Sequence, residues 1–360
     1  MRARARLVAV GLSLVLLAVL APGPEVVHAV STPTIEEMVG QKLIVRMDGR
    51  TPSAALTGRI QRGEIGGVIL FGWNFKGVQG LTQLTRDLQA IASNAGRPPL
   101  FIAVDQEGGG IRRLPWAEPV NQAVVMGARL SVAAVRRVGR ATGIALAAAG
   151  VNLNLAPVAD TPSTPSGFMY DAGRTFSRIS ARTAQLATAF ALGQESAGVS
   201  ATIKHFPGIG RVAENTDKVP GTVTASRAAL ASDLAAFTPA IDAGIDLVML
   251  SNVTYTAYDE NNAAGWSYAI ATTLLRGTLG FTGVTITDSL DGTAHSRGVT
   301  ARSLALRAAQ AGVDVVILTS PEFRSEKAFT LLCAQARAGH LSTLRLRASY
   351  DRILALKSGY

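Results

Sequence analysis

The feature that most constrains the fold of this chain is a repeated alternation of strand-like and helical segments. Eight runs of apolar and β-branched residues are bounded by turn-forming residues, and most of the intervals between them have helical periodicity. The predicted strands are residues 42–47, 66–72, 100–105, 151–160, 201–205, 247–253, 283–288 and 313–319. The predicted helices include residues 78–95, 131–149, 180–197, 226–243 and 301–311.

The strands read as continuous apolar runs, which is typical of strands buried on both faces of a parallel sheet. Eight strand–helix units predict an α/β fold, a TIM-type (β/α)8 barrel that forms a single domain over residues 30–360. A doubly wound open sheet is the alternative, and it should show a glycine-rich phosphate-binding fingerprint after its first strand. The three glycines at 108–110 follow the third strand and lack that spacing, which favours the barrel.

Residues 1–29 have the pattern of a secretory signal peptide. Three arginines precede an apolar run over residues 7–21, and the segment ends in Val27-His28-Ala29. Because this apolar run is short for a bilayer span, we expect export followed by cleavage, with an uncleaved membrane anchor as the alternative. The mature protein is then secreted or associated with the cell envelope and has no stable membrane span.

The chain is basic, and it contains a single cysteine. Loss of residues 1–29 removes three arginines and one glutamate and lowers the formal charge from +10 to +8. The charges are scattered and no nucleic-acid-binding motif is present, so we expect attraction to anionic polymers outside the cell rather than DNA or RNA binding. Cys333 is expected to be buried in a helix, and a lone cysteine excludes an internal disulfide and a cysteine-based metal site.

Charged side chains stand where four of the predicted strands end. Asp105 closes the third strand, Asp160 the fourth, Lys204 and His205 the fifth, and Asp288 the seventh. In a barrel these ends meet at one mouth, where acceptors for hydroxyl groups, cationic donors and a nucleophilic carboxylate converge on one pocket. We expect Asp160 to be a structural carboxylate that accepts hydrogen bonds from backbone amides.

Six segments of the chain, in order, carry a family resemblance. They read GGVILF from residue 66, VDQEGG from 104, NLAPVAD from 154, GRTF from 173, KHFPG from 204 and TDSL from 287. The set resembles glycoside hydrolase family 3 in its single-domain β-N-acetylhexosaminidase branch, over nearly all of residues 34–320. The resemblance implies a retaining β-glycosidase with a covalent glycosyl-enzyme intermediate and neither a metal nor an organic cofactor.

The resemblance also implies roles for individual residues. Asp288 is the expected catalytic nucleophile, and a carboxylate that ends a strand is well fixed for forming and releasing a glycosyl ester. Arginine and lysine can donate to sugar oxygens from directions that the barrel fixes in advance. The residues expected to hold the terminal sugar are Asp105, Arg113, Arg174, Lys204 and His205.

One loop departs from the family pattern. The branch normally has a histidine soon after its KHFPG segment and then an Asp-Ser-His triplet whose histidine is the general acid/base. Here Ile209 stands at the first position and Asn215-Thr216-Asp217 at the triplet. We predict that Asp217 is the acid/base, since a closed apolar pocket and the charge of Asp288 would raise the pKa of its carboxyl group; Glu214 is the reserve candidate.

The sequence therefore predicts an exported, exo-acting β-N-acetylhexosaminidase that acts on cell-wall or related glycans. Two alternatives stay open. A loop that donates no proton would leave a noncatalytic or much slowed carbohydrate-binding protein of the envelope. The chain also lacks the usual histidine and has Gly110 where the family has an arginine. Both departures leave a β-glucosidase-type specificity open.

Overall fold

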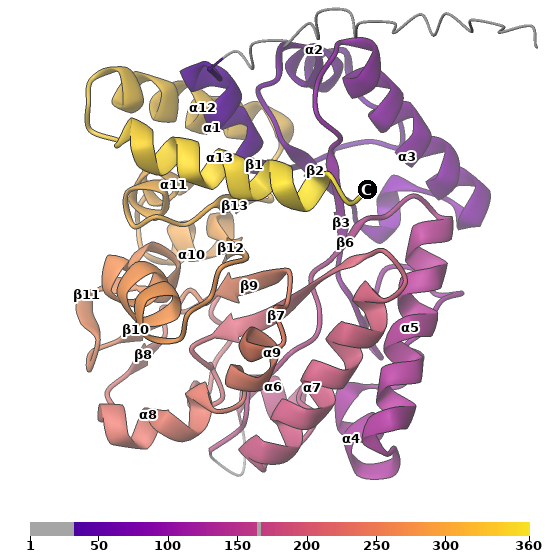
Figure 1. The fold of residues 1–360 in the computed structure, drawn as a ribbon, viewed down its shortest axis with the longest axis vertical. Coiled ribbons are helices and arrows are strands. Elements are labelled where there is room, and N and C mark those ends of the chain that lie inside the picture. The colour runs from indigo at the N-terminus through magenta and orange to yellow at the C-terminus, as the bar shows by residue number, and fades with distance from the viewer. Residues whose placement is uncertain (1–31, 164–166) are drawn as a thin grey trace, which may run out of the picture. The chain divides into compact units, whose positions relative to one another are not determined.

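Eight parallel strands close into a barrel within residues 33–360, as the sequence predicted (Figure 1). The structure is a computed structural model that describes residues 32–163 and 167–360, so the predicted signal peptide lies outside the described residues. Around the barrel the strands follow the order β1 (Leu43–Arg46), β13 (Val315–Leu318), β12 (Val284–Ser289), β9 (Leu247–Leu250), β7 (Ser200–Phe206), β6 (Leu153–Asn154), β3 (Phe101–Val104) and β2 (Gly67–Ile69).

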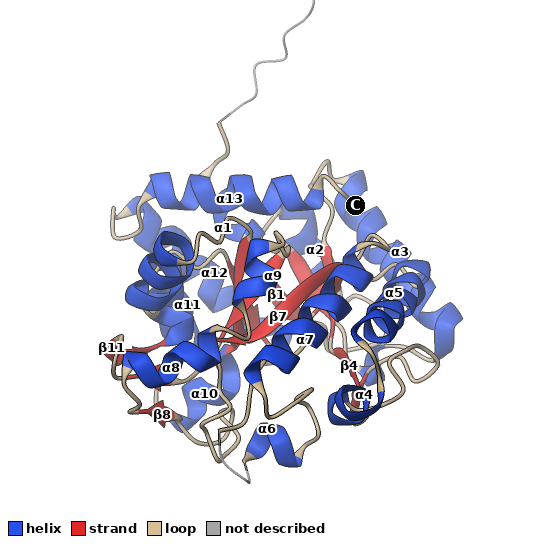
Figure 2. Cartoon of the chain, turned by 60° about the horizontal axis from the view of Figure 1, so that its bottom comes forward, coloured by secondary structure: helices blue, strands red, loops and turns tan. Residues whose placement is uncertain are grey.

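Helices surround the strands on the outside (Figure 2). Several begin at a serine or threonine whose side-chain oxygen accepts a hydrogen bond from the first helical turn, as at Ser53, Ser131 and Thr300. The helices are α1 (Ile35–Gln41), α2 (Ala54–Arg62), α3 (Gly77–Asn94), α4 (Ala123–Arg129), α5 (Val132–Ala148), α6 (Phe168–Asp171), α7 (Ser180–Glu195), α8 (Arg227–Leu234), α9 (Thr238–Asp242), α10 (Leu290–Ser296), α11 (Ala301–Gln310), α12 (Glu322–Arg337) and α13 (Thr343–Lys357).

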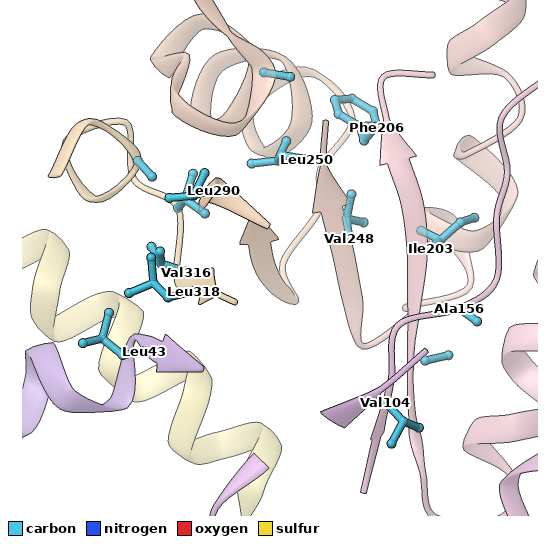
Figure 3. Close-up of a cluster of buried hydrophobic side chains, with 14 of the residues drawn as sticks. Leu43, Val104, Ala156, Ile203, Phe206, Val248, Leu250, Leu290, Val316 and Leu318 are labelled. Atoms are coloured by element: carbon cyan, nitrogen blue, oxygen red, sulfur yellow. The ribbon is translucent and has the colours of Figure 1, made fainter. Parts of the chain in front are cut away.

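The strands bury their two faces in two different apolar layers. On β13, Val316 and Leu318 join the layer between strands and helices, whereas Val315 and Ile317 point into the barrel lumen. Figure 3 shows part of the outer layer, where side chains such as Ile203 come from neighbouring strands. Because both faces are covered, the continuous apolar runs in the sequence correctly indicated a buried parallel sheet.

Two predicted elements are shorter than expected. The strand predicted over residues 151–160 is continuous only at Leu153–Asn154 and pairs again at an isolated bridge between Val158 and Lys204. Pro157 between them has no N–H group to donate to a neighbouring strand. The helix predicted over residues 226–243 is divided into α8 and α9, with Pro239 in the first turn of α9, where its ring is tolerated. Cys333 is buried in α12, as predicted.

Short strands in the loops complete the mouth of the barrel. A hairpin of β4 (Gln106–Gly108) and β5 (Ile111–Arg112) follows β3, and a small sheet joins β8 (Thr222–Val223), β10 (Thr254–Tyr255) and β11 (Asp259–Ala263). The sequence reading did not predict these strands. No helix in residues 32–163 and 167–360 is long and apolar enough to cross a bilayer.

Candidate active site

A cavity of about 330 Å³ opens at the carboxyl ends of the barrel strands. Its apolar floor is formed by lumen side chains that include Ile69, Leu155, Met249 and Ile317. Parallel strands end at one face of a barrel, which is why segments far apart in the sequence meet here. All seven predicted site residues line this cavity, namely Asp105, Arg113, Arg174, Lys204, His205, Asp217 and Asp288.

The cationic side of the cavity is organised by Glu107, which the sequence analysis did not single out. Its two carboxylate oxygens accept hydrogen bonds from Arg174, from Nε at 2.8 Å and from Nη2 at 2.7 Å. Glu107 Oε1 also lies 2.6 Å from Lys204 Nζ. This one buried carboxylate therefore fixes both cations, which come from loops and strands on different parts of the barrel.

The charges of this cluster stabilise one another. Burial of Glu107 opposes ionisation, but the neighbouring charges of Arg174 and Lys204 outweigh it and hold the pKa of Glu107 well below its usual range. Burial likewise disfavours the charged form of Lys204, whereas Glu107 and Asp105 raise the pKa of its amine. All three side chains thus stay ionised at neutral pH, and the cations are fixed in place before a ligand enters.

Asp105 completes the cluster on the solvent side. Lys204 Nζ donates to Asp105 Oδ1 at 3.1 Å, and Arg113 Nη2 lies 3.6 Å from Asp105 Oδ2. The guanidinium group of Arg113 also lies over the ring of Phe71, 5.6 Å from its centroid. Asp105 keeps some exposure, so its carboxylate can still accept a hydrogen bond from a ligand hydroxyl group.

His205 is oriented by a fully buried carboxylate. Its Nδ1 lies 2.7 Å from Asp160 Oδ2, which favours the tautomer with the proton on Nδ1 and leaves Nε2 available to a ligand. Asp160 Oδ1 accepts hydrogen bonds from the backbone N–H groups of His205 and Ile209. Asp160 is therefore the structural carboxylate that the sequence predicted.

Asp288 lies near the end of β12, on the wall of the cavity. Its Oδ1 accepts a hydrogen bond of 2.7 Å from the backbone N–H of Ser289. The following peptide is held in turn, because Asn252 Nδ2 donates to the carbonyl oxygen of Ser289 at 2.9 Å and the Ser289 hydroxyl contacts that of Thr319. The carboxylate is thus attached to a well-supported strand end.

Asp217 is brought to the same cavity by the loop that follows β7. Its backbone N–H donates to Asn215 Oδ1 at 2.9 Å, and the neighbouring Thr216 is buried. Asp217 as a residue is exposed at the cavity mouth, as Glu214 is. Desolvation of its carboxyl group where it faces the cavity, together with the charge of Asp288, nevertheless raises the pKa of Asp217 to about 6. Glu214, the reserve candidate, is exposed and does not line the cavity.

This arrangement can bind a polar, hydroxyl-rich ligand and place two carboxyl groups beside it. The fixed cations and Asp105 offer donors and an acceptor on one side, and the apolar floor fits a sugar ring. Asp288 and Asp217 lie in different surroundings, and such a difference allows one carboxyl group to stay ionised while the other carries a proton. The roles of the seven residues stay predictions at this point.

Comparison with known proteins gives the family. The model of the glycosyl hydrolase family 3 N-terminal domain matches residues 34–356. An uncharacterized secreted glycosyl hydrolase of Arthroderma benhamiae is 33% identical over 342 residues, which cover 92% of this chain and 96% of that protein.

Two solved structures are also similar. A family 3 β-N-acetylglucosaminidase from a Paenibacillus species superimposes with a TM-score of 0.88 at 32% identity over 91% of this chain, which spans 63% of that longer chain. A β-N-acetylhexosaminidase from Beutenbergia cavernae gives a TM-score of 0.83 at 33% identity and is covered over 99% of its length. The chain therefore belongs to glycosyl hydrolase family 3, as the sequence motifs indicated, and is a glycoside hydrolase built on a single barrel.

Proposed function

We propose that the protein is an exported, retaining, exo-acting β-N-acetylhexosaminidase with Asp288 as nucleophile and Asp217 as general acid/base. The observation that carries the proposal is the pair of carboxyl groups that line one cavity. Asp288 is fixed at a strand end, whereas the pKa of Asp217 is raised to about 6 by partial burial and by Asp288. An ionised nucleophile beside a protonated acid is the combination that a retaining glycosidase needs.

The chemistry proceeds in two displacements at the anomeric carbon. A carboxylate oxygen of Asp288 bonds to that carbon while the glycosidic bond breaks, and the leaving oxygen takes the proton of Asp217. In the second step Asp217, now a carboxylate, removes a proton from water; the water oxygen bonds to the anomeric carbon and the ester to Asp288 breaks. Two inversions leave the configuration unchanged. Because Asp217 must start protonated, hydrolysis should weaken as the pH rises above about 6.

The substrate class follows from the relatives and from the cavity. Two similar structures carry the names β-N-acetylglucosaminidase and β-N-acetylhexosaminidase. In this chain Lys204, Arg174 and Asp105 form a rigid polar wall for the hydroxyl groups of one terminal sugar. A cavity of about 330 Å³ is suited to a single sugar ring with a small substituent.

The setting outside the cytoplasm rests on the signal-like residues 1–29 and on the secreted relative from Arthroderma benhamiae. Cell-wall and related glycans are the polymers that an exported glycosidase meets there. The basic mature chain would also be attracted to glycans that carry negative charge.

Turnover of a panel of aryl β-glycosides tests this function. Wild-type protein should prefer the 2-acetamido sugar, and Asp288→Asn should lose several orders of magnitude of turnover, because the amide keeps the size of the side chain and removes the nucleophilic charge. Asp242→Asn, at an exposed site on α9, is the matched control and should keep full activity. A folded wild-type protein that binds the sugars and hydrolyses none would instead be a noncatalytic binder, and preference for a glucoside would overturn the proposed specificity.

A further inference from the structure

A second cavity, of about 470 Å³, lies beside the site and not within it. It is bounded by α10, α11 and the start of α12, which follow the last two strands of the barrel. The wall between the two cavities is thin. Ser289 and Thr319 line the first cavity, whereas Asp291, Leu318 and Ser320 line the second.

The interior of this cavity is apolar on one side and aromatic at its rim. Leu318, Ala294 and Ala328 are buried and form part of its lining. Phe323 also lines it and remains 61% exposed, which is unusual for a side chain of this size at the start of a helix. An apolar floor with an open aromatic ring offers a surface to the C–H face of a sugar.

Three cations also line the cavity. Arg302, Arg324 and Lys327 all line the cavity and are exposed, and none of them forms an ion pair with another residue in the described part of the chain. The Arg324 guanidinium lies 5.8 Å from the centre of the Phe323 ring, so cation and aromatic surface adjoin. The carboxylate in the lining, Asp291, is engaged by the backbone N–H groups of Thr319 and Ser320.

The three cations come from two helices. α11 and α12 both begin at this cavity. Ala301 and Arg302 of α11 line it, as do Phe323 and Arg324 of α12. The first-turn N–H groups are partly occupied, since Ser303 N–H donates to Thr300 Oγ1 and Glu322 N–H donates to Asp48 Oδ2. The positive charge at the cavity therefore comes from the arginine and lysine side chains. The fold thus places three cations that form no ion pair within the described residues around one hollow.

From this geometry we propose that the second cavity binds a negatively charged substituent, a carboxylate or a phosphate, carried by the glycan next to the terminal sugar. The inference rests on the proposed function, since it takes the terminal sugar to lie beside Asp288. Three steps of about 3.8 Å between neighbouring Cα atoms limit the distance from Asp288 to Asp291 to about 11 Å. One further sugar ring can therefore reach over the wall of Ser289 and Thr319.

Three disaccharides test this assignment. They share a terminal 2-acetamido sugar and differ only in the second sugar, which carries no charge, a carboxylate or a phosphate. Wild-type kcat/KM should be about tenfold higher for a charged disaccharide than for the neutral one, the effect of one charge-assisted contact. Which of the two anions is preferred identifies the substituent.

The site variant replaces all three cations, as Arg302→Gln, Arg324→Gln and Lys327→Gln together. It should abolish the preference, so that kcat/KM is about the same for charged and neutral disaccharides. Turnover of a neutral aryl glycoside should stay unchanged, because the three side chains lie outside the first cavity. The matched control replaces Arg86, Arg136 and Arg137, exposed arginines on α3 and α5, by glutamine and should keep the preference. Thermal unfolding checks that both triple variants are folded.

Three results would overturn the inference: no preference in the wild type, a preference that survives the site variant, or an equal loss in the control, which would show a general charge effect. Failure to hydrolyse any glycoside, aryl glycosides included, would be a failure of the proposed function instead. In that case titration calorimetry of the charged and neutral disaccharides against the same proteins decides whether the second cavity selects an anion.

Discussion

At the scale of single residues, Glu107 has the most connected position in the site. It lies almost out of contact with solvent and neutralises both Arg174 and Lys204. Removing the charge from one member of a buried ion cluster leaves its partners uncompensated in a poorly polarisable environment. Residues that are expected to hold the sugar therefore also contribute to the stability of the barrel mouth.

Glu107→Gln should lower the free energy of unfolding at pH 7 by about 3 kcal/mol, because buried Arg174 loses its carboxylate partner and buried Lys204 keeps only Asp105. The pKa of Glu107 is depressed in the folded state, so its stabilising effect is fully present above the unfolded pKa of about 4.3. It declines as the pH falls below that value and is lost once the pH has passed the folded-state pKa. Chemical denaturation at pH 7 and pH 3 should therefore show a difference between variant and wild type that shrinks in acid.

Glu260→Gln is the control for that measurement, since Glu260 is exposed on β11 and should change stability little at either pH. If Glu107→Gln has the same free energy of unfolding as the wild type at pH 7, Glu107 is not the residue that neutralises this cluster.

At the scale of elements, α10 connects the predicted nucleophile with the loop that carries the predicted acid. It begins two residues after Asp288, and its Gly292 packs directly against the backbone of Asp217. A Cβ atom at position 292 would lie 2.9 Å from the carbonyl oxygen of Asp217 and 3.1 Å from its Cβ atom. The absence of a side chain here allows the loop to lie over the cavity.

Gly292→Ala should therefore displace the Asp217 loop without unfolding the barrel. We expect about a tenfold loss of disaccharide hydrolysis, which needs a well-placed acid, and a much smaller loss on an aryl glycoside with an acidic phenol. Gly80→Ala on α3 is the control, because nothing lies within 4 Å of the added Cβ atom and activity should be unchanged. Equal rates for Gly292→Ala and wild type on the disaccharide would show that this contact does not position Asp217.

At the scale of the whole molecule, the sequence was sufficient to predict the barrel. Apolar runs of strand length can be recognised from the local sequence alone. All eight barrel strands accordingly overlap their predicted ranges. The seven predicted site residues line one cavity. Asp105, Lys204, His205 and Asp288 stand at the ends of predicted strands, which barrel topology brings together. Arg113, Arg174 and Asp217 lie in loops and were assigned from the family resemblance, and the roles of all seven stay predictions.

Other features depended on contacts that spacing does not determine. The role of Glu107 arises only when Arg174 and Lys204, 67 and 97 positions further along, fold against it. The short strands of the loops and the break at Pro239 likewise depend on packing and on one missing N–H group. The anion-binding cavity combines three helices whose contributions are unremarkable in isolation.

The proposed export concerns the whole chain, and the proposed signal peptide gives a direct prediction. Protein recovered from outside the expressing cells should lack residues 1–29, so intact mass and N-terminal sequencing should place the new terminus at Val30. A secreted protein that retains Met1 and the apolar run would contradict cleavage and support the membrane-anchor alternative.

We propose that Asp217 acts as the acid/base in place of the usual histidine, and the activity of Asp217→Ala on two leaving groups is the decisive measurement. A general acid matters most when the leaving group is poor. The variant should be nearly inactive on a disaccharide of the 2-acetamido sugar and keep far more activity on an aryl glycoside with an acidic phenol. Added azide should restore part of the aryl glycoside rate, because it attacks the glycosyl-enzyme without a base. Equal slowing on both substrates with no effect of azide would contradict the claim.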